Sequence, residues 1–122
     1  MSSTLCALVV DDVAAVRGYI SQILQQLGVS RVLEAADGDS ASKLFREYRP
    51  DMVFLDIQLP DINGQQLLKL FRKEDAETAV FMVSAFSSVE NLKMAVENGA
   101  RAFVIKPFTA TRITNLVQPL LH

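Results

Sequence analysis

Five polar residues stand at the ends of apolar runs in this chain, where their side chains could take part in chemistry together. They are three carboxylates, a hydroxyl and an ammonium: Asp11, Asp12, Asp56, Ser84 and Lys106. Three carboxylates that lie close together repel one another, so either one of them is protonated or a cation joins them. Oxygen ligands without histidine or cysteine suit Mg²⁺, which accepts one or two carboxylates together with a phosphate.

A divalent cation, a lysine and a hydroxyl around one carboxylate would make a site that accepts a phosphoryl group. Asp56 would be the nucleophile, as carboxylates are when aspartyl phosphates form. Lys106 would supply a point charge for the phosphoryl oxygens, and Ser84 would hydrogen-bond one of them. Each residue also has an ordinary explanation, as a loop or helix cap, an acidic helix start or a surface lysine. Their coincidence at the ends of four different runs favours the common site.

The elements that must position these residues alternate between strands and helices. Apolar runs of strand length cover residues 5–10, 31–35, 52–56, 79–83 and 102–105. Apolar residues at helical spacing follow each run, over 16–27, 41–48, 64–73, 92–96 and 113–121. Leu92, Ala95 and Val96 mark the fourth helix. Five such alternations with short connections predict an α/β domain with a parallel sheet and helices on both faces. The carboxyl ends of the strands then share one edge, where ligands bind in such sheets.

Composition narrows the class of protein. The chain has 122 residues, the size of one domain, so residues 1–122 are expected to form a single unit. A hydrophobic share of 50% and a net charge of -2 predict a folded core and exclude sequence-independent nucleic-acid binding, which needs basic clusters. Each apolar run is shorter than the roughly 20 residues that span a bilayer. The lone Cys6 and the absence of a secretory pattern at the start predict a cytoplasmic location.

The chain resembles the receiver domain of two-component response regulators over nearly its whole length. The matching motifs are Val9–Asp12, Phe54–Pro60 with Asn63–Gly64, Val83–Ala85 and Lys106–Phe108. As a spaced set these motifs are highly specific, although each alone is weak. The resemblance implies a flavodoxin-like three-layer sandwich, doubly wound, with strand order 2-1-3-4-5. It also implies that Asp56 takes a phosphoryl group from a histidine on a partner kinase or phosphotransfer protein.

The resemblance further implies how a metal ion would be held. Asp12 and Asp56 would bind Mg²⁺ directly, Gln58 would offer its main-chain carbonyl, and Asp11 would act largely through water. The peptide bond between Lys106 and Pro107 would be cis, as receivers usually have it, and would aim the lysine inward.

The resemblance to receivers also implies a conformational switch. The hydroxyl of Ser84 would move toward the phosphoryl group, and Phe103 would turn inward to fill the vacated space. The output face would then be the fourth helix, the fifth strand and the fifth helix. Its candidate exposed charges are Lys93, Glu97, Arg101 and Arg112. Ordinary core packing explains a strand phenylalanine as well, and charged helix faces are usually only solvated.

Two positions are expected to set the lifetime of the phosphoryl group, namely Gln58 and Phe86. Phe86 lacks an acid or amide that could position an attacking water, so the phosphoryl group is expected to be lost slowly. The small residues Ala14, Ala15 and Gly18 form a face of the first helix that, in this family, docks the histidine donor. The alternative is that these small residues simply pack.

The function predicted from the sequence is a stand-alone phosphorylatable switch. It would dock a target directly, as chemotaxis regulators do, or pass the phosphoryl group on in a phosphorelay. It would catalyse its own phosphorylation and slow autodephosphorylation rather than turn over an external substrate. The alternatives are a receiver cut from a larger regulator and a pseudo-receiver that only binds partners. An aspartyl phosphatase would need an Asp where Gln58 stands, and Asp11 with Asp12 would repel a flavin phosphate.

Overall fold

Strands and helices alternate along the chain, and the structure, a computed structural model, describes residues 4–121. The strands in this range are β1 (Cys6–Val10), β2 (Arg31–Ala35), β3 (Met52–Leu55), β4 (Ala79–Ser84) and β5 (Ala102–Ile105). The helices are α1 (Ala14–Gln26), α2 (Gly38–Tyr48), α3 (Gly64–Glu74), α4 (Val89–Glu97) and α5 (Ala110–Val117), and a short 3-10 helix, η1 (Gln118–Leu120), follows α5.

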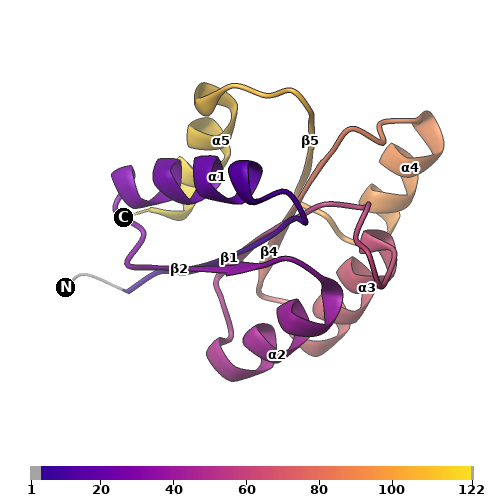
Figure 1. The fold of residues 1–122 in the computed structure, drawn as a ribbon, viewed down its shortest axis with the longest axis horizontal. Helices are drawn as coiled ribbons and strands as arrows, with labels where there is room; N and C mark the ends of the chain where they lie inside the picture. The colour runs from indigo at the N-terminus through magenta and orange to yellow at the C-terminus, as the bar shows by residue number, and fades with distance from the viewer. Residues whose placement is uncertain (1–3, 122) are drawn as a thin grey trace.

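The five strands form one parallel sheet in the order β2-β1-β3-β4-β5, which confirms the doubly wound topology. Helices α1 and α5 cover one face of the sheet, and α2, α3 and α4 lie on the other (Figure 1). The central strands are buried on both faces, which explains why they read as continuous apolar runs rather than as alternating ones. No helix within residues 4–121 is both long and apolar enough to cross a membrane.

Successive strand residues point to opposite faces and build two hydrophobic clusters. On the α1 and α5 side, the rings of Phe54 and Phe81 stack with centroids 5.0 Å apart. On the other side, Phe45 of α2 stacks on Phe71 of α3 with centroids 4.1 Å apart. The first aromatic pair joins the neighbouring strands β3 and β4, and the second joins the helices α2 and α3.

Helix α4 is held to the body by few contacts. Among its residues, all of which the structure describes, only Ala95 is buried. Leu92, Ala95 and Val96 all lie in this helix, as the sequence predicted, but Val96 is 71% exposed. The main polar connection comes from α3, where the Nε2 of buried Gln65 donates to the main-chain oxygen of Asn91 over 2.9 Å. The Oε1 of Gln65 is buried without a hydrogen-bond partner among residues 4–121.

The last helix is shorter than the apolar spacing predicted. Helix α5 begins at Ala110, where the Thr109 side chain accepts a hydrogen bond from the Arg112 N–H, and it ends at Val117. The predicted extension to Leu121 was wrong, because Pro119 lies in η1 and proline cannot donate the hydrogen bond that continues an α-helix.

Candidate functional site

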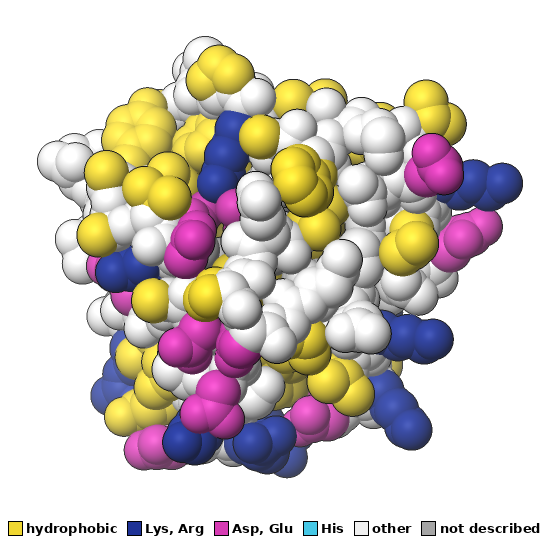
Figure 2. Space-filling model, turned by 45° about the vertical axis from the view of Figure 1, so that its right-hand side comes forward, with side chains coloured by type: hydrophobic (Ala, Val, Ile, Leu, Met, Phe, Trp, Pro, Cys, Tyr) yellow, Lys and Arg dark blue, Asp and Glu magenta, His cyan; other side chains and the backbone are white. Residues whose placement is uncertain are grey.

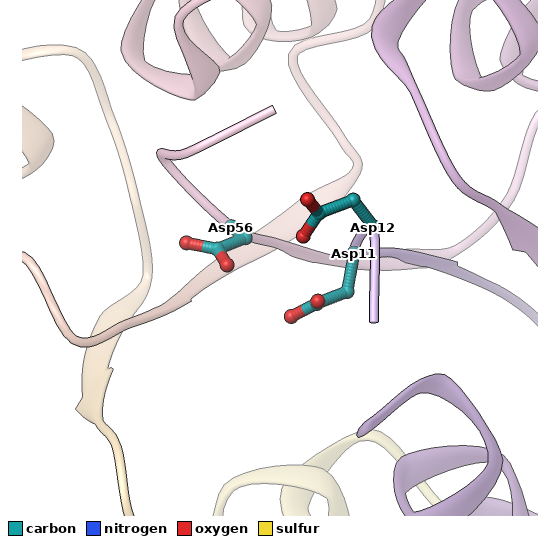
Figure 3. Close-up of side chains that lie close together, drawn as sticks. All are labelled: Asp11, Asp12 and Asp56. Carbon is teal, nitrogen blue, oxygen red and sulfur yellow. The ribbon is translucent and has the colours of Figure 1, made fainter. Parts of the chain in front are cut away.

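Three carboxylates lie together beyond the ends of β1 and β3 (Figure 3). One oxygen from each of Asp11, Asp12 and Asp56 lies within 4.8 Å of the others. The parallel register pairs Val10 with Leu55, so the next residues of both strands leave the sheet side by side. Asp11 is 2% exposed and Asp56 is 5% exposed, whereas Asp12 is exposed to solvent.

Lys106 brings a positive charge into this cluster from the end of β5. Its Nζ lies 2.7 Å from Oδ2 of Asp11 and 2.9 Å from Oδ2 of Asp56, and its side chain is 19% exposed. The peptide bond between Lys106 and Pro107 is cis, as the resemblance implied. The structure thus brings together the carboxylates and the ammonium that the sequence placed at strand ends.

Burial and charge have opposing effects on the protonation of this cluster. Burial raises the pKa of Asp11, and its hydrogen bonds with Lys106 and with the Val13 N–H only partly offset that rise. Burial alone would lower the pKa of Lys106, but the two carboxylates outweigh it and raise that pKa. The ammonium therefore stays charged at neutral pH, and one lysine faces three carboxylates.

An all-oxygen cluster with excess negative charge fits a hard divalent cation. Carboxylates are the ligands that Mg²⁺ prefers, and histidine and cysteine are absent from the cluster found among the described residues. The N–H of Gln58 donates to Oδ1 of Asp56 over 3.2 Å, which places the Gln58 main chain next to the cluster. The residues present therefore fit the magnesium site that receivers generally have.

Ser84 is the last residue of β4 and is 1% exposed. Its main-chain oxygen accepts from the Lys106 N–H over 3.1 Å, so β4 and β5 deliver the hydroxyl and the lysine side by side. Its hydroxyl oxygen accepts from the N–H of Phe86, whose side chain is 46% exposed at the start of the loop to α4. Phe103 is half-buried and packs against the hydrophobic cluster on the α2, α3 and α4 side of the sheet.

Arg17 and Asp61 support the site, and sequence reasoning missed both. Arg17 donates to the main-chain oxygen of Asp11 over 2.7 Å and pairs with Glu34 of β2 over 3.2 Å, so it fixes the chain that carries Asp11. Asp61 in the loop after β3 bonds to the start of α2. No sequence signal separates either residue from an ordinary surface charge, because their partners lie on other elements.

A hollow of about 560 Å³ opens beside Lys106, between α1 and the segment after β5. It is lined mainly by apolar side chains, including Ala15, Tyr19 and Phe108, and the rings of Tyr19 and Phe108 lie 5.7 Å apart. Ala14, Ala15 and Gly18 are all exposed on α1. The small face predicted from the sequence therefore borders an open apolar surface next to the acidic cluster.

The fold and the site together define a class of protein. A parallel sheet of order 2-1-3-4-5 with an acidic cluster and a lysine at the strand carboxyl ends is the flavodoxin-like arrangement of receivers. The family model described as "Response regulator receiver domain" matches residues 7–118. The chain belongs to this family, which works in two-component signalling and whose CheY-like members interact with kinases and downstream targets.

Individual relatives agree with this assignment. The chemotaxis protein CheY of Bacillus subtilis (strain 168) is 35% identical over 115 residues, covering 94% of this chain and 96% of that protein. A CheY-like receiver domain protein from Methanospirillum hungatei JF-1 has a TM-score of 0.91 at 27% identity, covering 97% of this chain and 94% of that chain. A chain of the CheX-CheY-BeF3-Mg+2 complex from Borrelia burgdorferi has a TM-score of 0.89 at 26% identity, covering 97% of this chain and 90% of that chain.

Proposed function

We propose that this chain is a phosphorylatable switch in which Asp56 accepts a phosphoryl group from a phosphohistidine. The donor is a histidine kinase or a histidine phosphotransfer protein, and the transfer depends on Mg²⁺. The observation that carries the proposal is the pairing of one buried carboxylate, Asp56, with Lys106 inside a cluster of three carboxylates. That arrangement supplies a nucleophile and the opposite charges that a phosphoryl group needs.

In the transfer, an oxygen of Asp56 bonds to phosphorus while the bond from phosphorus to the donor imidazole nitrogen breaks. In this structure the Nζ of Lys106 donates a hydrogen bond to Oδ2 of Asp56. During the transfer it donates to a phosphoryl oxygen instead and offsets the negative charge there. Asp12 and Asp56, with the main-chain carbonyl of Gln58 and with Asp11 through water, would hold Mg²⁺. The bound ion would neutralise charge on the phosphoryl oxygens.

The same proposal includes an output. Ser84 closes on the phosphoryl group and Phe103 changes its packing, so that the face formed by α4, β5 and α5 binds a downstream protein. Lys93, Glu97, Arg101 and Arg112 are the charges proposed for this face. Its support is an unusual exposure of apolar side chains, since Val89 is 79% exposed and Ile105 is 49% exposed. Figure 2 shows hydrophobic side chains standing apart among polar and charged ones on the side of the molecule that α4 occupies.

The relatives support the chemistry. The Borrelia burgdorferi structure is described as a complex of CheX, CheY, BeF3 and Mg, and beryllofluoride mimics a phosphoryl group on a carboxylate. We propose residues 1–122 as one receiver domain acting in the cytoplasm, without binding nucleic acid, either by itself or within a longer regulator. The phosphoryl group would act through a docked target, as in chemotaxis, or move on in a phosphorelay.

The test is phosphorylation by acetyl phosphate with Mg²⁺, followed by intact mass. The wild-type chain is expected to gain one phosphoryl group, and Asp56→Asn is expected to gain none, because an amide oxygen is a poor nucleophile. Omitting Mg²⁺ should also prevent the adduct. An unmodified wild-type chain that also fails to bind beryllofluoride would contradict the proposal and favour a pseudo-receiver that acts only by binding partners.

Phe86 is predicted to prolong the phosphorylated state. Its exposed ring stands two residues beyond Ser84 and offers no group that could orient an attacking water. Phe86→Glu is expected to speed autodephosphorylation about tenfold, which lies below the usual range for an added general base. The loss of the adduct is followed by mass after the acetyl phosphate is removed, with Phe86→Leu as the control that keeps an apolar side chain. Faster decay in the wild type than in Phe86→Glu would refute this role.

A further inference from the structure

The loop that joins β3 to α3 is fastened to a different helix, α2, by the side chain of Asp61. Its Oδ1 accepts from the Gly38 N–H over 2.8 Å, and its Oδ2 accepts from the Asp39 N–H over 2.9 Å. These N–H groups belong to the first turn of α2, where the helix itself supplies no acceptor. A carboxylate is also the charge that a helix N-terminus favours.

The side chain of Ile62, in the same loop, lies close against the start of α2 as well. A Cβ atom on Gly38 would overlap the side chain of Ile62, and it would lie 3.3 Å from Oδ1 of Asp61. Helix α2 already has a cap of its own, because Asp37 accepts from the Ser40 N–H over 2.8 Å. The start of α2 therefore binds two carboxylates, one at its own N-cap and one that arrives from a loop 22 or 23 residues further along the chain.

The opposite end of the same loop lies at the acidic cluster. Gln58 and Asn63 pair across the loop as an isolated antiparallel bridge, and the Gly64 N–H donates to the Ile57 oxygen over 2.7 Å. Gln58 also donates its N–H to Oδ1 of Asp56. The segment 57–64 is thus a closed loop with Asp56 at its base and Asp61 near its tip, and Gln58 lies between them along the chain.

We propose that Asp61 is a positioning residue for the divalent cation. By bonding to α2 it holds the loop so that the Gln58 main-chain carbonyl and the Asp56 carboxylate keep the spacing that the ion requires. This inference rests on the proposed function, in which these two groups bind Mg²⁺. Mg²⁺ demands nearly ideal octahedral geometry, so a loop that drifts by a fraction of an ångström loses affinity for it.

The test compares Asp61→Ala with Asp37→Ala. Both substitutions remove a carboxylate from the start of α2, but only the first releases the loop. The dissociation constant for Mg²⁺ alone is measured by titrating the main-chain amide chemical shifts of each folded, unphosphorylated chain. Asp61→Ala is expected to weaken Mg²⁺ binding about tenfold, the lower end of what supporting residues around metal ligands contribute. Asp37→Ala is expected to stay within about twofold of the wild type, because the Asp37 side chain bonds to Ser40 of α2 and not to the loop.

Asp61→Asn is the conservative variant. It keeps one oxygen that can accept from the Gly38 N–H, so its Mg²⁺ affinity is expected to lie between those of the wild type and Asp61→Ala. If the alanine variant does not fold, the Mg²⁺ affinity of Asp61→Asn tests the proposed role of Asp61 in its place. Unchanged Mg²⁺ affinity in the folded Asp61 variants would overturn the inference, and so would an equal loss in Asp37→Ala, which would trace the effect to the stability of α2. A wild-type chain that binds no Mg²⁺ would contradict the proposed function itself.

Discussion

Replacing Lys106 with methionine is expected to slow phosphorylation of Asp56 by acetyl phosphate by about a hundredfold to a thousandfold, the size of the effect that the loss of one charge-stabilising donor has in enzymes. The Nζ of Lys106 lies 2.9 Å from Oδ2 of Asp56, so it is placed to follow the charge that develops on the transferred phosphoryl oxygens. Methionine keeps the length and the apolar stem of the side chain but removes that charge. The rate is measured from the growth of the phosphorylated mass with time.

The same substitution should leave Mg²⁺ binding intact or make it tighter. Lys106 neutralises part of the charge of Asp11 and Asp56, so its removal leaves the three-carboxylate cluster more negative. Slow phosphorylation with tight Mg²⁺ binding would therefore separate the chemical step from metal binding. The control is Lys43→Met, because the Lys43 side chain is 71% exposed on α2 and pairs with Asp39, away from the acidic cluster. Phosphorylation of Lys106→Met at the wild-type rate would contradict the assigned role.

Replacing Gly64 with alanine is expected to lower the free energy of unfolding by about 3 kcal/mol, at the upper end for forcing atoms into a packed site. A Cβ atom at this position would overlap the main-chain oxygen of Asp56 and lie 2.6 Å from the Cα of Ile57. Both neighbours are backbone atoms of the loop that carries the acidic cluster, so neither can rotate away. The melting temperature should fall by roughly 10 °C.

Gly18→Ala supplies the matched comparison. Gly18 lies inside α1, and a Cβ atom there would meet nothing within 4 Å. Alanine is the better helix former, so this variant is expected to gain about 0.5 to 1 kcal/mol of stability. Both free energies come from urea unfolding followed by circular dichroism. Equal stability of the two variants would show that the loop relaxes around the added methyl group.

The sequence predicted the fold and the gathering of the acidic cluster because both follow from topology. Once five strands run parallel, Asp11, Asp56 and Lys106 must emerge at one edge, whatever the details of packing. The contacts of Arg17 and Asp61 could not be predicted from the sequence, since each depends on where a second element lies in space. The exposure of Val96 could not be predicted for a related reason: periodicity shows that a helix has an apolar face but not that anything covers it.

Pro119 is a different case. Its missing N–H is visible in the sequence and favours a shorter last helix, whereas the apolar spacing of Leu116, Leu120 and Leu121 continues past the proline. The two leucines after the proline still pack partly against the hydrophobic cluster on the α1 and α5 side. Burial therefore continued beyond the point at which the backbone left the helix.

The sparse attachment of α4 has a thermodynamic consequence. A helix that buries only Ala95 and is tied to α3 by one side-chain amide can open locally while the sheet stays folded, since opening exposes little apolar surface. The populations of its docked and undocked forms are then sensitive to small perturbations, because about 1.4 kcal/mol changes such a ratio tenfold. A central strand opens at a much larger free-energy cost. The same change of about 1.4 kcal/mol would therefore leave it almost entirely folded. A small change in free energy, such as that of one covalent modification, can therefore shift the ratio of docked to undocked α4.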